Sequence, residues 1–209
     1  MRICKSRFVF LSVILVSSLC CSQSQKAPVS NQRTLQVEES VGGSVVTNLG
    51  YGIQVNKGSS LHRRWFVVND PTCPIRLSGA RIETVYQSGN VGGSYQYRST
   101  GTATLSEPAS ALEIRFLLFD IWGDHMRTLS DTEVSDVTGQ IALKGSAGWT
   151  AWENDVSELF TVVSFVARVR KADGTVWAYD PASLVREVEK IKVTLTEKEL
   201  APEKEKPKG

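Results

Sequence analysis

Apolar and polar residues alternate over several short segments in the middle of the chain. Residues 62–70, 75–86 and 94–105 combine β-branched or aromatic side chains with polar neighbours, and a proline turn ends the first segment. Gly79 interrupts the second segment, and a glycine inside a strand pattern marks a bulge. The period of two predicts three β-strands.

Residues 111–120 carry the most hydrophobic of these patterns. One face of this predicted strand is apolar throughout: Leu112, Ile114, Phe116 and Leu118. The opposite face is polar at Glu113 and Arg115 and becomes apolar from Leu117 onward. A strand that is buried first on one side and then on both sides predicts the core of a β-sandwich.

The C-terminal part adds a hairpin and a helix. Residues 159–170 are rich in β-branched and aromatic side chains, and Asp173-Gly174 separates them from T-V-W-A-Y, which is a strong hairpin signal. Asp180 then has the place of a helix N-cap, with Pro181 at the first helical position. Apolar residues follow at helical spacing: Leu184, Val185, Val188 and Ile191. We expect this helix to pack one stripe against the sheet.

About seven short strands and one C-terminal amphipathic helix indicate a mainly β chain, folded as an antiparallel β-sandwich. Ser130 and Glu133 have the spacing of a capping box, which predicts a single helical turn.

The first residues have the pattern of a secretory signal peptide. Arg2, Lys5 and Arg7 precede an apolar run over residues 8–19, which is too short for a permanent membrane span. We therefore assign residues 1–22 to a signal peptide, so that the mature protein is expected in the periplasm or cell envelope, or secreted.

Lipid modification is the alternative to plain cleavage. Cys20 and Cys21 end the apolar run, where an exported bacterial lipoprotein carries its modified cysteine. The lipoprotein signal has a small residue directly before that cysteine and an aliphatic residue three before it. Cys20 follows Leu19, and Cys21 has Ser18 three positions earlier, so neither fits well. Both alternatives stay open, and a lipid anchor would be the protein's link to a membrane.

The remaining chain divides by composition. Residues 23–39 are polar without an apolar period and predict a flexible tether. Residues 40–196 form the predicted sandwich domain with its helix. Residues 197–209 mix charges with proline and predict a disordered tail.

Charge and cysteine content change when the signal peptide is removed. Lys plus Arg falls from 24 to 21 while Asp plus Glu stays at 22, which leaves a mature chain near −1. A nearly neutral protein has no electrostatic footprint for nucleic acid. Cys73 is then the one cysteine certain to remain in the folded part, where it is either a buried small hydrophobe or a thiol available to a partner chain.

The stretch F-L-L-F-D-I-W-G-D-H, residues 116–125, could hold a metal or form a turn. Asp120, Asp124 and His125 offer ligands, but they have no calcium-loop spacing and no second histidine nearby. A turn needs only that Asp120 ends the strand and accepts turn N–H groups, with Asp124 and His125 in solvent. We favour the turn, and we expect no metal and no cofactor.

Catalytic and binding residues give weaker signals. No G-x-S-x-G motif occurs, and a distant pair of Cys73 with His62 is the remaining candidate for nucleophilic catalysis. Trp149 and Trp152 lie in a loop-like stretch and form a candidate contact surface for sugar or protein. Alternatively, both fold back to cap one end of the sandwich.

Phe116, Leu118, Phe119 and Asp120 lie in F-L-L-F-D, which resembles the F-x-L-Y-D signature of a family of small immunoglobulin-like domains in exported bacterial proteins. Phe119 replaces the tyrosine of that signature. The resemblance covers residues 101–129 and implies an immunoglobulin-like sandwich outside the cytoplasm, without an assigned reaction.

These observations favour an exported, non-catalytic binding or scaffolding protein of the cell envelope. Its partner would be another protein or an envelope component. An accessory subunit of an envelope assembly is the alternative, with a sheet edge or the helix over residues 184–191 as its contact. A hydrolase acting outside the cytoplasm is the weaker alternative.

Overall fold

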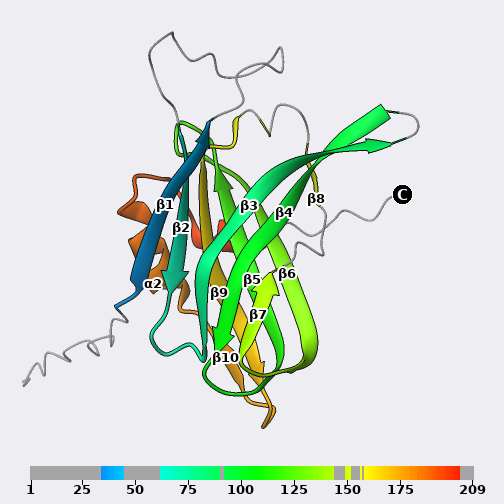
Figure 1. Ribbon diagram of the computed structural model, residues 1–209. Helices are drawn as coiled ribbons and strands as arrows, with labels where there is room; N and C mark the ends of the chain where they lie inside the picture. Colours follow the sequence, from blue (N-terminus) through cyan, green and yellow to red (C-terminus); the bar gives the residue numbers. More distant parts are fainter. Residues whose placement is uncertain are drawn as a thin grey trace, which may run out of the picture. The chain divides into compact units, whose positions relative to one another are not determined.

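The described part of the chain forms two β-sheets, helix α2 and a short 3-10 helix, as seen in the computed structural model (Figure 1). The structure describes residues 34–44, 62–89, 92–143, 149–151, 156 and 158–202. All of them belong to one compact unit that begins at Gln32. The chain is mainly β, as the alternating pattern predicted.

The larger sheet, here sheet A, has the strand order β1-β2-β9-β5-β6, and β10 pairs with the end of β9. Its strands are β1 (Gln36–Ser44), β2 (His62–Asn69), β5 (Ala109–Phe119), β6 (His125–Val137), β9 (Thr161–Lys171) and β10 (Val176–Ala178). Strands β2 and β9 run parallel, whereas the other pairs are antiparallel. The prediction of a purely antiparallel sandwich is therefore wrong at this pair. The long chain between β2 and β9 supplies the crossover that parallel strands need.

The smaller sheet, here sheet B, has the order β3-β4-β7, and β8 also pairs with β4. Its strands are β3 (Ile75–Gly89), β4 (Gly92–Leu105), β7 (Gln140–Leu143) and β8 (Trp149–Ala151). The register between β3 and β4 shifts between Ser78 and Arg81. Gly79 lies in this bulge with φ +59°, so the bulge predicted at this glycine is confirmed.

Sheet A is buried on both faces. Its inner face packs on sheet B, and Ile114, Phe116 and Leu118 of β5 belong to this inter-sheet core. Its outer face packs on the C-terminal part of the chain, and Leu117 and Phe119 belong to this second core. The two-faced burial predicted for β5 is confirmed.

Helix α2 (Pro181–Glu189) covers the outer face of sheet A. The Asp180 side chain accepts a hydrogen bond from the Ser183 backbone N–H at 3.3 Å, and Pro181 opens the helix. Leu184 and Val188 are buried in the second core. The predicted cap, start and packing stripe of this helix are confirmed.

Two segments expected to be flexible contain regular structure. Strand β1 starts at Gln36, inside the predicted tether of residues 23–39, and Glu38 and Glu39 form ion pairs with arginines of β3 and β2. The 3-10 helix η1 (Glu197–Leu200) lies inside the predicted tail, and Leu200 is fully buried in the second core. Contacts with residues far away in the sequence order both segments. Such contacts cannot be predicted from the local pattern of residues.

One local prediction is wrong. The spacing of Ser130 and Glu133 predicts a capped helical turn, but both residues lie in strand β6. Strand β6 pairs along β5, and the Ser130 hydroxyl donates to Glu113 at 3.1 Å. Tertiary pairing therefore overrides the capping motif. Within the described ranges, no helix is long and apolar enough to cross a membrane.

Candidate functional site

The stretch after β5 forms a tight turn. Asp120 accepts hydrogen bonds at one carboxylate oxygen from the backbone N–H of Trp122 at 2.9 Å and of Asp124 at 2.8 Å. Gly123 has φ +86°, and its carbonyl accepts from the Thr194 backbone N–H at 2.8 Å. The turn is therefore tied to the segment that follows α2.

His125 does not point into solvent, contrary to the turn interpretation. Its side chain is 12% exposed, and its Nε2 lies 2.8 Å from the Thr128 hydroxyl. The ring packs edge-on against Phe119, and Nδ1 is 3.8 Å from a Glu199 carboxylate oxygen. His125 thus joins β6 to η1. Among the residues described, no group of three or more His, Cys, Asp or Glu is placed to hold a metal ion.

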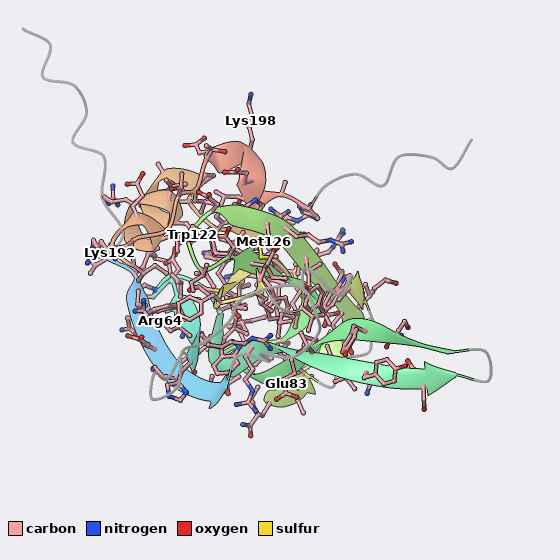
Figure 2. All side chains as sticks on the ribbon, turned by 90° about the horizontal axis from the view of Figure 1, so that it is seen from above. Arg64, Glu83, Trp122, Met126, Lys192 and Lys198 are labelled. Atoms are coloured by element: carbon pink, nitrogen blue, oxygen red, sulfur yellow. The ribbon has the colours of Figure 1, made fainter. Side chains whose placement is uncertain are left out.

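Trp122 is an exposed aromatic that the sequence did not single out. Its side chain is 83% exposed at the end of the molecule viewed in Figure 2. Hydrogen bonds hold the backbone here: the Trp122 N–H donates to the Asp120 carboxylate at 2.9 Å, and the Gly123 carbonyl accepts from the Thr194 N–H at 2.8 Å. Trp122 therefore stands in solvent on a well-fixed turn.

The structure describes one of the two tryptophans of the predicted contact surface. Trp149 lies in β8, is half-buried and meets Phe116 edge-to-face with 6.2 Å between ring centroids. It packs against the inter-sheet core. This favours the capping interpretation for Trp149. Trp152 and the candidate lipidation residues Cys20 and Cys21 lie outside the described residues.

Cys73 and His62 are not placed for nucleophilic catalysis. His62 is the first residue of β2, and Cys73 follows the other end, where its N–H bonds to the Asp70 carbonyl. Eight residues of β-strand span about 23 Å. Burial raises the pKa of the half-buried Cys73 thiol to about 12, which keeps it protonated at neutral pH. The pairing considered from the sequence is therefore wrong.

A surface groove with a volume of about 370 Å³ lies between the two sheets. Strands β1 and β2 of sheet A form one side and β3 of sheet B forms the other. In Figure 2, Arg64 marks β2 and Glu83 marks β3. The residues that matter for its chemistry are Gly42, Arg63, Trp65, Arg81, Glu83 and Thr84. We call this feature the β2–β3 groove.

Arg63 is buried at this groove, with only 8% of its surface exposed. Its guanidinium donates to the carbonyls of Leu159 at 3.0 Å and Val156 at 2.5 Å, and to the Thr84 hydroxyl at 3.1 Å. All three acceptors are uncharged, and within the described ranges no carboxylate forms an ion pair with it. Burial lowers the pKa of Arg63, but an arginine side chain stays charged in proteins. The groove therefore holds a buried positive charge.

Trp65 is the aromatic side chain among the described residues that line the groove. Its indole Nε1–H donates to the Ile82 carbonyl at 3.2 Å, which fixes the ring between the sheets. The Arg81 guanidinium lies 5.8 Å from the centroid of the Trp65 ring. Gly42 has no side chain beside the ring, and a Cβ there would lie 3.4 Å from Trp65 Cζ3. The glycine therefore keeps the space beside the ring open.

Arg81 and Glu83 form the charged rim on β3. Their side chains form an ion pair at 2.7 Å and are both substantially exposed. With Arg63, the charged side chains that line the groove among the described residues are two arginines and one glutamate, a balance of +1. Such a site can hold an anion, and an exposed ion pair at its mouth is weak enough to rearrange.

The sequence contained a signal for this site. The strand period of two places Arg63, Trp65 and Val67 on one face of β2. Val67 belongs to the inter-sheet core, so the same face turns inward at Arg63 and Trp65. An arginine and a tryptophan that share a strand face with a core residue indicate a polar site at the edge of the core.

Searches against known proteins find no match: no family model, no curated protein and no solved structure is similar to this chain. The function of the β2–β3 groove has to be inferred from its own side chains.

Proposed function

We propose that this protein is an exported, non-catalytic binding protein of the cell envelope and that it holds its ligand in the β2–β3 groove. One observation carries the proposal. Arg63 is a buried charge bonded to neutral acceptors, and it lies beside a fixed tryptophan in an open groove. Concave sites with one aromatic wall and a few convergent polar groups are typical of small-ligand binding.

Sequence features support the location. The signal-peptide pattern of residues 1–22 supports export, to the periplasm, the envelope or the medium. Lipidation at Cys20 or Cys21 remains part of the proposal as an alternative to plain cleavage. The F-L-L-F-D strand and the turn after it support an immunoglobulin-like sandwich of the FxLYD type.

A second candidate is an accessory subunit of an envelope assembly. Helix α2 is a poor contact for a partner, because its apolar residues Leu184 and Val188 are already buried. The ends of β3 and β4 project beyond the other strands in Figure 1. Residues 85–97 contain no charged residue, and Tyr86 is 56% exposed and stacks edge-on against Tyr95. Tyrosine, serine, glycine and asparagine are the residues that antibodies use for adaptable contacts.

A hydrolase is the weaker alternative. Its candidate nucleophile and base, Cys73 and His62, lie at opposite ends of strand β2. They are therefore too far apart to act together.

Purification from the envelope fraction of the protein's own host tests the binding proposal. Gly42→Leu would place a side chain beside Trp65 and fill the groove. We therefore expect this variant to retain roughly tenfold less ligand than the wild-type protein, the change in affinity that one good contact contributes. Val37→Leu is the matched control, because Val37 is an exposed residue of the same strand and does not line the groove. Glycan and protein analysis of the bound material gives the readout.

The outcomes separate the two candidates. Material lost with Gly42→Leu and retained with Val37→Leu supports groove binding. A single protein partner that is retained equally by both variants contradicts groove binding and favours the accessory subunit. Absence of the protein from the envelope fraction and the medium contradicts export.

A further inference from the structure

We infer that the β2–β3 groove selects a carboxylate attached to a ring with a flat apolar face, such as an acidic sugar of the uronic acid type. This inference rests on the proposed function and names the ligand class for the same groove. The carboxylate would meet Arg63, and the ring would lie against Trp65.

A comparison of Arg63 with a second buried arginine, Arg115, supports a negatively charged ligand. The Arg115 side chain is 12% exposed, and its guanidinium donates to the buried carboxylate of Glu113 at 2.6 Å. Arg63 is buried to a similar degree but donates to two carbonyls and a hydroxyl. A buried charge is costly unless a counter-charge compensates it. The protein supplies that counter-charge to Arg115. None of the residues that the structure describes supplies it to Arg63, where a bound anion would.

The shape of the Arg63 guanidinium favours a carboxylate as the anion. Its N–H groups form a planar fork that matches the two oxygens of a carboxylate, and such charge-assisted pairs are about twice as strong as neutral hydrogen bonds. Three of its N–H groups are already used, by Leu159, Val156 and Thr84. An arginine has five N–H donors, so two of them have no partner among the described residues and can meet a ligand.

Trp65 supports a ligand with a flat face. Arg63 and Trp65 are two residues apart on one face of β2, which sets their Cα atoms about 7 Å apart. A ligand of one ring can therefore reach both side chains at once. Gly42 leaves the space beside Trp65 free, and the bond from the indole to Ile82 holds the ring before a ligand arrives. A fixed aromatic wall lowers the entropic cost of binding.

Arg81 supports the same charge preference from the rim. It is exposed, pairs with Glu83 and lies over the ring of Trp65. A second positive group at the mouth would attract an acidic ligand, and this attraction should weaken as salt rises.

Calorimetric titration with galacturonic acid trimer tests the inference. We expect the trimer to bind the wild-type protein and its uncharged methyl ester to bind at least about tenfold more weakly, because the ester cannot accept the charge-assisted hydrogen bonds that a guanidinium gives to a carboxylate. Benzoate, which carries its carboxylate on an aromatic ring, is titrated in parallel. The comparison shows whether the groove prefers a sugar acid or an aromatic acid. The salt dependence is measured in the same series.

Variants locate the binding. Arg81→Gln should weaken binding of the acid several-fold and leave the ester unaffected. Arg76→Gln is the matched control, because Arg76 is an exposed arginine of the same strand that does not line the groove. Arg63→Met should abolish binding of the acid, with circular dichroism as the check that it folds. If Arg63→Met does not fold, the comparison of Arg81→Gln with Arg76→Gln still tests whether the carboxylate binds in the groove.

The outcomes distinguish this inference from the proposed function. Equal affinity for acid and ester, or equal effects of Arg81→Gln and Arg76→Gln, overturns the carboxylate assignment. If neither the trimer nor benzoate binds but host material is still lost with Gly42→Leu, the ligand class is wrong and the groove function stands. If Gly42→Leu also has no effect, the groove function fails as well.

Discussion

Replacing Glu113 by alanine is expected to lower the free energy of unfolding by about 3–5 kcal/mol, the usual cost of removing one partner from a buried ion pair. Glu113 is 5% exposed and accepts hydrogen bonds from Arg115 and Arg168, each at 2.6 Å, and from Ser130 at 3.1 Å. Arg115 also donates to the Leu200 carbonyl at 2.9 Å. The substitution therefore leaves the buried Arg115 guanidinium without its counter-charge, and Arg115 is the residue that bonds η1 to sheet A.

Urea unfolding followed by circular dichroism measures this effect. Glu133→Ala is the matched control, because Glu133 is an exposed acid on the neighbouring strand β6, and we expect a change within about 0.5 kcal/mol. Equal effects of the two substitutions would show that the Glu113 network does not stabilise the fold.

The same carboxylate predicts a pH dependence. Burial alone would raise the pKa of Glu113, but the hydrogen bonds and charges of Arg115 and Arg168 outweigh it and hold the pKa below its usual value. A lowered folded-state pKa stabilises the protein fully above the unfolded pKa of about 4.3. This stability is lost as the pH falls through the folded-state pKa. The difference between wild type and Glu113→Ala should therefore shrink between neutral and strongly acidic pH.

Phe116→Ala should cost about 3–5 kcal/mol of unfolding free energy, the typical cost of truncating a buried phenylalanine. Phe116 is fully buried between the sheets and meets Trp149 edge-to-face. The substitution removes the ring from the centre of the inter-sheet core and leaves a cavity that β-sheets cannot easily close. Tryptophan fluorescence should also shift, because Trp149 loses its neighbour.

Trp122→Ala is the control for this substitution. It also removes a large aromatic side chain, but Trp122 is 83% exposed and should change stability by no more than about 0.5 kcal/mol. Comparable losses from the two variants would contradict the burial pattern of β5 and its turn.

Local signals predicted the elements that depend on neighbouring residues. The two faces of β5, the Asp173-Gly174 hairpin and the capped start of α2 each follow from a few consecutive side chains. Chain periodicity and turn chemistry are sufficient for such elements because their physical causes are local.

Long-range pairing determines the features that the sequence did not predict. Strand β1 has few apolar residues and is held by its backbone pairing with β2. The parallel strands β2 and β9 are neighbours in the sheet, but they are about a hundred residues apart in the sequence. Leu200 is buried because η1 folds back on sheet A, bonded through Arg115. None of these contacts leaves a local pattern.

The β2–β3 groove depends on both kinds of information. The alternation in β2 places Arg63 and Trp65 on the inward face, and this was visible in the sequence. Their hydrogen bonds to Thr84 and Ile82 come from sheet B, and only the packing of the sheets brings them together. The functional meaning of the arginine therefore appears only in the folded chain.

Nuclear magnetic resonance of the ¹⁵N-labelled mature protein tests the central claim most directly. On titration with galacturonic acid trimer, the indole N–H signal of Trp65 and the Nε–H signal of Arg63 are predicted to shift, while the indole signal of Trp122 stays in place. Unchanged Trp65 and Arg63 signals at saturating trimer, or a shift confined to Trp122 or Trp149, would contradict the assignment of the β2–β3 groove as the binding site.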